Sequence, residues 1–320
     1  MGRRTASALV GVAALGIVAA TGYAVLNHVG PLAESGQCTA TVAGRTVELG
    51  TEQAENAALI AAMSVRRGMP ARAASIALAT AYQESKLYNL QRGDRDSLGL
   101  FQQRPSQGWG SREQILDPVF ATTAFYDALQ KVDGYESMRI TEAAQKVQRS
   151  GFPEAYADHE ADARVLASAL TGQSFHAFSC AVDDDVDSAP RRLTGIGLTR
   201  RADDVRREVE AAFGDLPLGG FAAGGVRDGH MEGSAHYDGR AVDIFVRPIS
   251  QRNKERGWAV AQYLVAQADR LAVQTVIFDG RIWRAGSRSD DGWRDYDPPA
   301  RSGDRRILEH RDHVHVDVFA

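Results

Sequence analysis

The chain lacks the marks of a nucleic-acid-binding protein. Its formal net charge is −4, and no run of lysine and arginine stands out against that balance. Binding to a phosphate backbone needs clustered positive charge, so the sequence argues against nucleic acid as a partner. Internal repeats and low-complexity tracts are also absent. A hydrophobic content of 44% and a charged content of 24% are ordinary for a folded protein, and 320 residues suffice for two domains.

Cysteine is scarce, because only Cys38 and Cys180 occur in the whole chain. They stand just outside the two ends of one predominantly helical region. If the chain is exported, a disulfide between them persists, and it would close a loop of about 140 residues. In the chain-entropy model such a bridge contributes about 4 kcal/mol. The sequence therefore favours a Cys38–Cys180 disulfide over the alternative of two buried free thiols.

The N-terminus combines two arginines with a long uncharged stretch. Arg3 and Arg4 precede residues 6–26, which carry no charge and are mostly apolar. A helix of this length, at about 1.5 Å per residue, is just long enough to span a bilayer core. The sequence predicts a signal anchor within residues 1–30, a single pass through the cell membrane, a cytoplasmic N-terminus and extracellular domains. The alternative is a cleaved signal peptide and a secreted protein.

The remainder of the chain divides by its residue pattern. A short β-hairpin is predicted over 38–50, followed by helices over 51–67, 72–86, 117–132, 141–149 and 158–170. Residues 181–195 are charged and lack an apolar period, which is typical of a linker. Beyond it, helices alternate with strands. The predicted fold class is multidomain: a transmembrane helix, a mostly α domain over 38–180, and an α+β domain with an antiparallel sheet over 196–320.

Histidine and aspartate gather in the last part of the chain. In a strand over 313–319, alternate side chains face opposite sides, so His313 and His315 share one face and the valines share the other. Asp243 has the same relation to the apolar residues of a strand over 241–247, and His236 lies just before it. Two imidazoles and a carboxylate, with a water in the fourth position, are typical of a catalytic zinc site.

The pattern Ser-x-His-x-x-Gly-x-Ala-x-Asp, followed by a late His-x-His, resembles the zinc peptidases of the LAS group: lysostaphin-type enzymes, D-Ala-D-Ala metallopeptidases and hedgehog-like domains. The resemblance implies that zinc is held by His236, Asp243 and His315. It implies a general base at Asp312 and an arginine at Arg227 that polarises the scissile carbonyl. His313 would be a neighbouring or transition-state group. The alternative is a solvated strand end whose histidines only form hydrogen bonds.

A second centre is predicted at the end of the apolar helix over 72–86. Glu84 closes this helix, and burial there should raise its pKa, as a general acid for glycoside cleavage requires. Glu84 with the following Ser85, and then a Gly-Leu-Phe-Gln segment at 99–102, resemble the lysozyme-like lytic transglycosylases.

This resemblance implies a glycan groove. The residues expected to bind the glycan there are Gly99, Phe101, Gln102, Gln148 and Tyr156. The third motif of that family, Ala-x-Asn-x-Gly, is met only in part, by residues 144–150, and no second carboxylate is compelling. The alternative is a lysozyme-like module that binds glycan without cleaving it.

Together the two resemblances predict an exported, membrane-anchored hydrolase of peptidoglycan, of the kind found in actinobacterial-type cell walls. The C-terminal domain would cut stem or cross-link peptides with zinc, and the first domain would bind or cut the glycan as a transglycosylase or muramidase. The expected partners are peptidoglycan and, through the N-terminal helix, the membrane. The competing hypothesis is a non-catalytic wall-binding or assembly protein in which one or both hydrolase-like domains are inactive.

Overall fold

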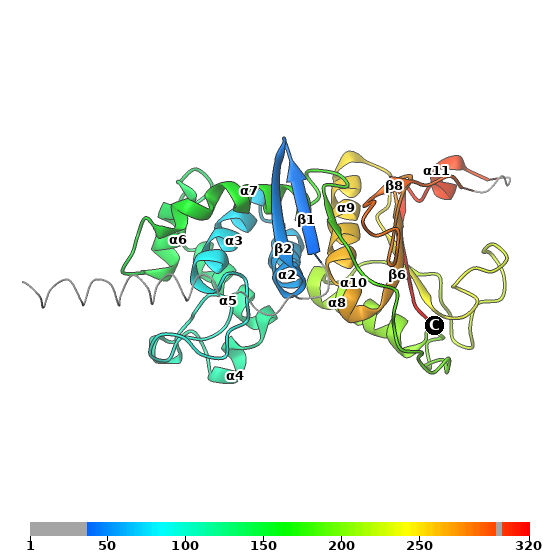
Figure 1. Ribbon diagram of the computed structural model, residues 1–320, viewed down its shortest axis with the longest axis horizontal. Coiled ribbons are helices and arrows are strands. Elements are labelled where there is room, and N and C mark those ends of the chain that lie inside the picture. Colours follow the sequence, from blue (N-terminus) through cyan, green and yellow to red (C-terminus); the bar gives the residue numbers. More distant parts are fainter. Residues whose placement is uncertain (1–36, 299–302) are drawn as a thin grey trace, which may run out of the picture. The chain divides into compact units, whose positions relative to one another are not determined.

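The computed structural model describes residues 37–298 and 303–320, and residues Gly36–Ala320 make up one compact unit (Figure 1). The described fold is α+β, with two antiparallel sheets. The buried apolar side chains of its helices and of its larger sheet belong to one continuous core.

The structure does not support the predicted membrane anchor. Its segment, residues 6–26, lies outside the described residues. Among the residues that are described, no helix is both long and apolar enough to cross a bilayer. Helices α2 (Thr51–Arg66) and α9 (Gln251–Ala266), with 16 residues each, would be only about 24 Å long. The fold class that included a transmembrane helix, and the single-pass localisation that depended on it, are therefore withdrawn.

Helices dominate the first half of the described chain, close to where the sequence pattern predicts them. After α2 come α3 (Ala71–Ser85), α4 (Arg112–Ile115), α5 (Pro118–Leu129), α6 (Ile140–Gln148) and α7 (Glu160–Leu170), with short 3₁₀ turns at Pro105–Gln107 and Ala155–His159. Helix α3 is central, since its alanine-rich surface is buried on nearly all sides and contacts α2, α6 and α7. Small side chains allow these close approaches. The helix ends at Lys86, which adopts a left-handed conformation.

A three-stranded sheet holds the two ends of this helical region together. Strands β1 (Gln37–Val42) and β2 (Arg45–Gly50) form the predicted hairpin, and β3 (Phe178–Cys180) pairs with the other edge of β1. Cys38 and Cys180 are directly opposite each other in this pairing, and they form a disulfide. The predicted bridge is therefore confirmed.

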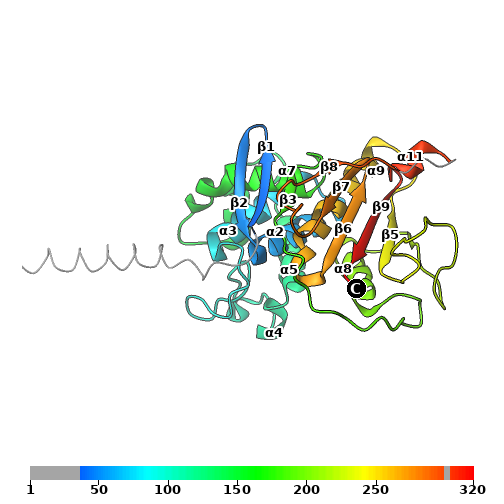
Figure 2. The same cartoon turned by 45° about the vertical axis from the view of Figure 1, so that its right-hand side comes forward.

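The second half of the chain forms the larger sheet, whose strand order is β4-β5-β9-β6-β7-β8. Strands β5, β9, β6 and β7 can be followed side by side in Figure 2. Its strands are β4 (Leu218–Gly219), β5 (Ala241–Phe245), β6 (Val273–Phe278), β7 (Arg281–Arg284), β8 (Arg294–Asp295) and β9 (His313–Val318). Helix α9 packs against β6 and β9. Helices α8 (Arg200–Phe213), α10 (Ala268–Leu271) and α11 (Arg305–Leu308) complete this half.

Helix α9 also packs against the helical half. The fully buried amide of Gln262 donates to the carbonyl of Ala169 (2.6 Å) and accepts from the backbone N–H groups of Ala177 and Phe178 (2.8 Å each). Gly172 fits beside α9 only because it lacks a side chain, since a Cβ there would lie 1.9 Å from the carbonyl oxygen of Glu255. The segment predicted as a linker forms no helix or strand over 181–192.

Candidate metal centre and a buried glutamate

Strand pairing brings the predicted zinc ligands together. In the register of β5 with β9, Asp243 is opposite His315, and Phe245 is opposite His313. His313, His315 and Asp317 face a cleft, while the intervening valines of β9 are buried in the core. The alternation expected for a half-buried strand is therefore present. His236 reaches the same place from the loop that precedes β5.

Donor atoms of three side chains form a small triangle. The Nε2 atom of His236 lies 3.1 Å from Nδ1 of His315 and 3.2 Å from Oδ1 of Asp243, and the latter two atoms are 3.1 Å apart. With bonds of about 2.0 Å, the ligands of a tetrahedral zinc are roughly 3.3 Å apart. The triangle fits that spacing closely.

The opposite ring nitrogens of both histidines are held by acceptors. His236 donates from Nδ1 to the carbonyl oxygen of Gly220 at 2.7 Å, and His315 donates from Nε2 to the Asp317 carboxylate at 3.3 Å. When these rings are neutral, each turns a lone pair towards the space between the three donor atoms, as metal-binding histidines do. Gly220 has a φ of +77°, and a Cβ there would lie 2.2 Å from the His236 ring. Three lone pairs that face one another need a cation or a proton between them.

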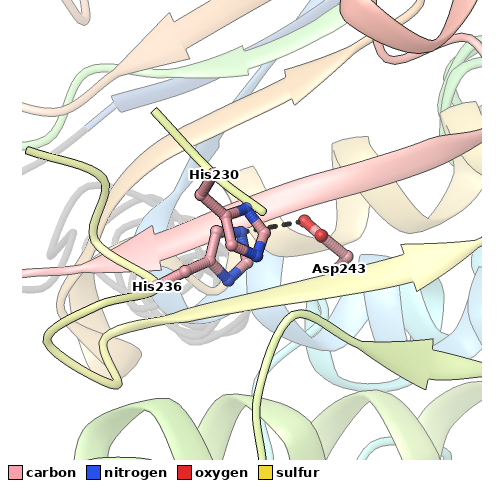
Figure 3. A group of neighbouring side chains, drawn as sticks. All are labelled: His230, His236 and Asp243. Atoms are coloured by element: carbon pink, nitrogen blue, oxygen red, sulfur yellow. Dashed lines mark ion pairs between the residues drawn. The ribbon is translucent and has the colours of Figure 1, made fainter. Parts of the chain in front are cut away.

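A second grouping of side chains overlaps this triangle. Donor atoms of His230, His236 and Asp243 all lie within 4.8 Å of one another, so this group can hold a metal ion (Figure 3). The ring of His230 stacks on that of His236, with centroids 3.9 Å apart. His230 did not emerge from the sequence analysis, because it stands in a glycine-rich loop without a strand or helix period to place it.

Neighbouring charges shift the pKa values at this centre. Burial alone would raise the pKa of Asp243, but its hydrogen bonds with His236 and His315 outweigh burial and lower it. Burial opposes protonation of His315, yet its bonds with Asp243 and Asp317 raise its pKa to about 9. His310, whose ring lies beside that of His313 at 4.6 Å, has its pKa lowered to about 3, mainly by burial.

Asp312 does not occupy the position expected of a general base. Its side chain is buried, with the residue 4% exposed, and it is not among the residues that line the cleft. One carboxylate oxygen accepts a hydrogen bond from Arg247 at 2.7 Å, and the other lies 2.8 Å from Nδ1 of His313. The Nε2 atom of His313 lies 3.9 Å from Oδ1 of Asp243. Asp312 thus orients His313, and His313 faces the donor triangle.

Arg227 is also not where the resemblance implies. It is exposed on the loop between β4 and β5, and it does not line the cleft. Among the described residues, the arginines that do line the cleft are Arg240 and Arg284. The cleft has a volume of about 620 Å³, and its walls also include His310 and Tyr296.

The Glu84 centre lies in the helical half, at the last turn of α3. The hydroxyl of Tyr156 donates to Oε1 of Glu84 at 2.7 Å. Burial raises the pKa of Glu84, although hydrogen bonds with Tyr156 and Gln148 act against the rise. A position at the C-terminal end of a helix further disfavours a negative charge. Tyr156 and Gln148, two residues predicted for this centre, therefore lie beside Glu84.

The segment at 99–102 adopts a tight turn beside this glutamate. Gly99 has a φ of +72°, and a Cβ there would lie 2.6 Å from the carbonyl oxygen of Ile115. The side chain of Phe101 is fully buried and stacks on Phe125, so its predicted contact with glycan is wrong. Its carbonyl instead accepts a hydrogen bond from Gln148 at 2.8 Å. Gln102 is partly exposed and donates to the carbonyl of Gly99 at 3.2 Å.

A comparison with known families gives one match. The model described as VldE, C-terminal domain, matches residues 194–305, about a third of the chain. The matched segment contains His230, His236 and Asp243 but ends before β9. No curated protein matches the chain.

Proposed function

We propose that the chain is a zinc-dependent peptidase that acts on the peptide stems or cross-links of peptidoglycan. The observation that carries the proposal is the triangle of donor atoms from His236, Asp243 and His315, with edges of 3.1 to 3.2 Å, beside an imidazole that an aspartate orients.

The donor set suits zinc better than magnesium or calcium. Two imidazole nitrogens with one carboxylate oxygen are a donor set typical of zinc, a borderline-soft cation, whereas the hard cations magnesium and calcium prefer oxygen ligands. Three protein ligands leave a fourth position open, which is typical of catalytic rather than structural zinc. When bound, zinc supplies Lewis-acid chemistry: it increases the acidity of a water molecule and polarises a carbonyl group.

We assign the proton transfers of this reaction to side chains of the protein. Asp312 accepts the Nδ1–H of His313 at 2.8 Å and so leaves Nε2 of that ring free to take a proton from the attacking water. Arg247 pairs with Asp312 at 2.7 Å. With His313, it lowers the pKa of Asp312, although burial alone would raise it. Asp312 therefore stays ionised and stabilises the imidazolium that forms. His313 then returns the proton to the leaving amine.

The choice of substrate depends on both centres. A cleft of about 620 Å³ has room for a few amino-acid residues rather than a folded protein. Glu84, whose pKa is raised by burial and whose carboxyl group accepts a hydrogen bond from Tyr156, suits contact with a glycosidic oxygen. Peptidoglycan is a polymer that contains both glycosidic and peptide bonds. The resemblance to wall-cutting peptidases and transglycosylases supports the same choice.

Digestion of purified sacculi by the full chain tests this function. Zinc-loaded protein should release shortened or unlinked stem peptides, and mass spectrometry of the products identifies the bond that is cut. The His313→Ala variant, loaded with the same amount of zinc, should release almost none. Unchanged stem peptides after digestion with the zinc-loaded wild type would contradict the proposal.

A second candidate function is glycan cleavage at Glu84, which the hydrogen bond from Tyr156 favours. The Glu84→Gln variant keeps the shape of the side chain but has no acidic proton. It should bind glycan and release no anhydro or reducing sugar ends, whereas the wild type releases them. If neither protein shortens glycan, the helical half is a binding module, as the non-catalytic alternative expects.

A further inference from the structure

A second cavity lies beside the metal cleft and is strongly basic. It has a volume of about 690 Å³ and is formed by residues 189–195 together with the N-terminal part of α8. Six arginines line it: Arg191, Arg192, Arg200, Arg201, Arg207 and Arg240. Only two acidic side chains, Asp203 and Asp204, share the lining. Such a concentration of positive charge is unexpected in a chain whose net charge is −4.

Part of this charge is already used by the fold. The buried Asp203 binds Arg206 at 2.7 Å and Arg207 at 2.6 Å. Arg201 donates to backbone carbonyls, including that of Ala320 at 3.1 Å, and Arg240 donates to the carbonyl of Val318 at 2.7 Å. These groups hold the walls of the cavity in place.

Three guanidinium groups remain without a partner. Among the described residues, Arg191, Arg192 and Arg200 form no ion pair and no side-chain hydrogen bond. One of them begins α8, a helix of 14 residues whose first N–H groups carry the positive end of the helix dipole. The hydroxyl oxygen of Thr194, another lining residue, is buried and has no hydrogen-bond partner in the described part of the chain.

These donors suit an oxyanion that carries more than one acceptor oxygen. Guanidinium groups bind phosphate through paired hydrogen bonds, and the N-terminus of a helix binds phosphate through its backbone N–H groups. Three separate guanidiniums around a cavity of this volume exceed what one small anion needs. The arrangement therefore fits several phosphate groups on one molecule.

We propose that this cavity is a binding site for a phosphate-bearing polyanion. The cavity adjoins the metal cleft, because Arg240 and Phe319 line both. A polymer held there would lie next to the cleft. The proposal rests on the arginines and on α8, and it holds whether or not the cleft cuts peptides.

Binding of a fluorescent inorganic polyphosphate to the full chain tests the proposal. The protein is stripped of metal first, so that phosphate has no metal to bind. The triple variant Arg191→Ser/Arg192→Ser/Arg200→Ser should bind polyphosphate at least tenfold more weakly than the wild type. The matched control is Arg92→Ser/Arg149→Ser/Arg288→Ser, which removes three exposed arginines from outside the cavity and should bind like the wild type.

Three results would overturn the proposal. The first is no binding of polyphosphate by the wild type. The second is an equal loss in both triple variants, because the attraction would then reflect total charge rather than the cavity. The third is equal or tighter binding of polyglutamate of matched charge. The first result includes the case in which the protein binds phosphatidylglycerol vesicles but not soluble polyphosphate. Polyphosphate binding that depends on the three arginines, and that exceeds polyglutamate binding, supports it.

Discussion

The two chemical centres of this protein use opposite means to control ionisation. At Glu84, a single carboxyl group is partly buried near a helix end, and burial raises its pKa. At the metal centre, the Asp243 carboxylate is buried too, but two imidazoles lower its pKa. The surroundings of Glu84 thus disfavour its charged form, whereas the imidazoles beside Asp243 favour the charged form of that carboxylate.

The largest effect should follow from removal of the shared carboxylate. In Asp243→Ala, two buried imidazoles lose their common partner, so we expect zinc content to fall to background and stem cleavage to fall at least a thousandfold. Metal analysis and muropeptide digestion measure both. His159→Ala, which removes a histidine from the helical half, is the control and should keep both. Full zinc content in Asp243→Ala would show that this carboxylate is not needed for zinc binding, which would contradict the prediction.

The next prediction separates the base from the residue that orients it. His313→Ala and Asp312→Asn should both retain zinc, and His313→Ala should lower turnover by about two to four orders of magnitude, the usual range for a lost general base. Asp312→Asn should lower turnover less, because His313 remains but loses the carboxylate that orients it. Near-normal turnover in His313→Ala, with loss in Asp312→Asn, would return the role of base to Asp312.

The disulfide should affect stability and leave the metal centre unchanged. Loss of the covalent link in the double variant Cys38→Ala/Cys180→Ala should lower the free energy of unfolding by up to about 4 kcal/mol. Denaturant titration measures the change. Zinc content should stay that of the wild type, because the bridge joins β1 and β3 rather than the larger sheet. Loss of zinc at temperatures where the variant is folded would contradict this prediction, because it would show that the disulfide and the metal centre are coupled.

The smallest effects concern partly buried glutamates whose pKa is raised. Burial raises the pKa of Glu55 from 4.5 to about 7, and it also raises the pKa of Glu84. A raised folded-state pKa gives stability that is fully present below the unfolded value and is lost as the pH rises through the folded value. Between pH 4.5 and 8, Glu55→Gln should therefore gain stability relative to the wild type by a few degrees in Tm, most of it by about pH 7. A pH-independent difference in Tm would contradict the pKa shift.

Much of the sequence prediction depended on the local periodicity of apolar and polar residues. The alternation of histidine and valine over 313–318 placed β9 and its cleft-facing side chains, and the apolar run before Glu84 placed that carboxyl in a buried setting. Tyr156 is 72 residues from Glu84, yet its predicted neighbourhood agrees with the hydrogen bond between them. These features depend on strand and helix geometry, which a short stretch of sequence determines.

The features that were missed depend on distant contacts or on loops. Arg247 is 65 residues from Asp312, and only the fold reveals that the two side chains form an ion pair. Phe101 was assigned to a groove because of its motif, but packing against Phe125 buries it. His230 stands in a glycine-rich loop, where no periodicity predicts the direction of a side chain. The anchor was inferred from apolar length alone, and the described helices do not include such a span.

Zinc titration of two matched variants tests which histidine is the third ligand of the metal centre. His230 and His315 are the rival third ligands, since both lie close to His236 and Asp243. Competition with a chromophoric chelator measures both the number of zinc ions bound per full-length chain and their dissociation constant. We predict that His230→Ala binds one zinc with nearly wild-type affinity, whereas His315→Ala binds zinc at least a hundredfold more weakly. Retained zinc affinity in His315→Ala, with loss in His230→Ala, would contradict this prediction.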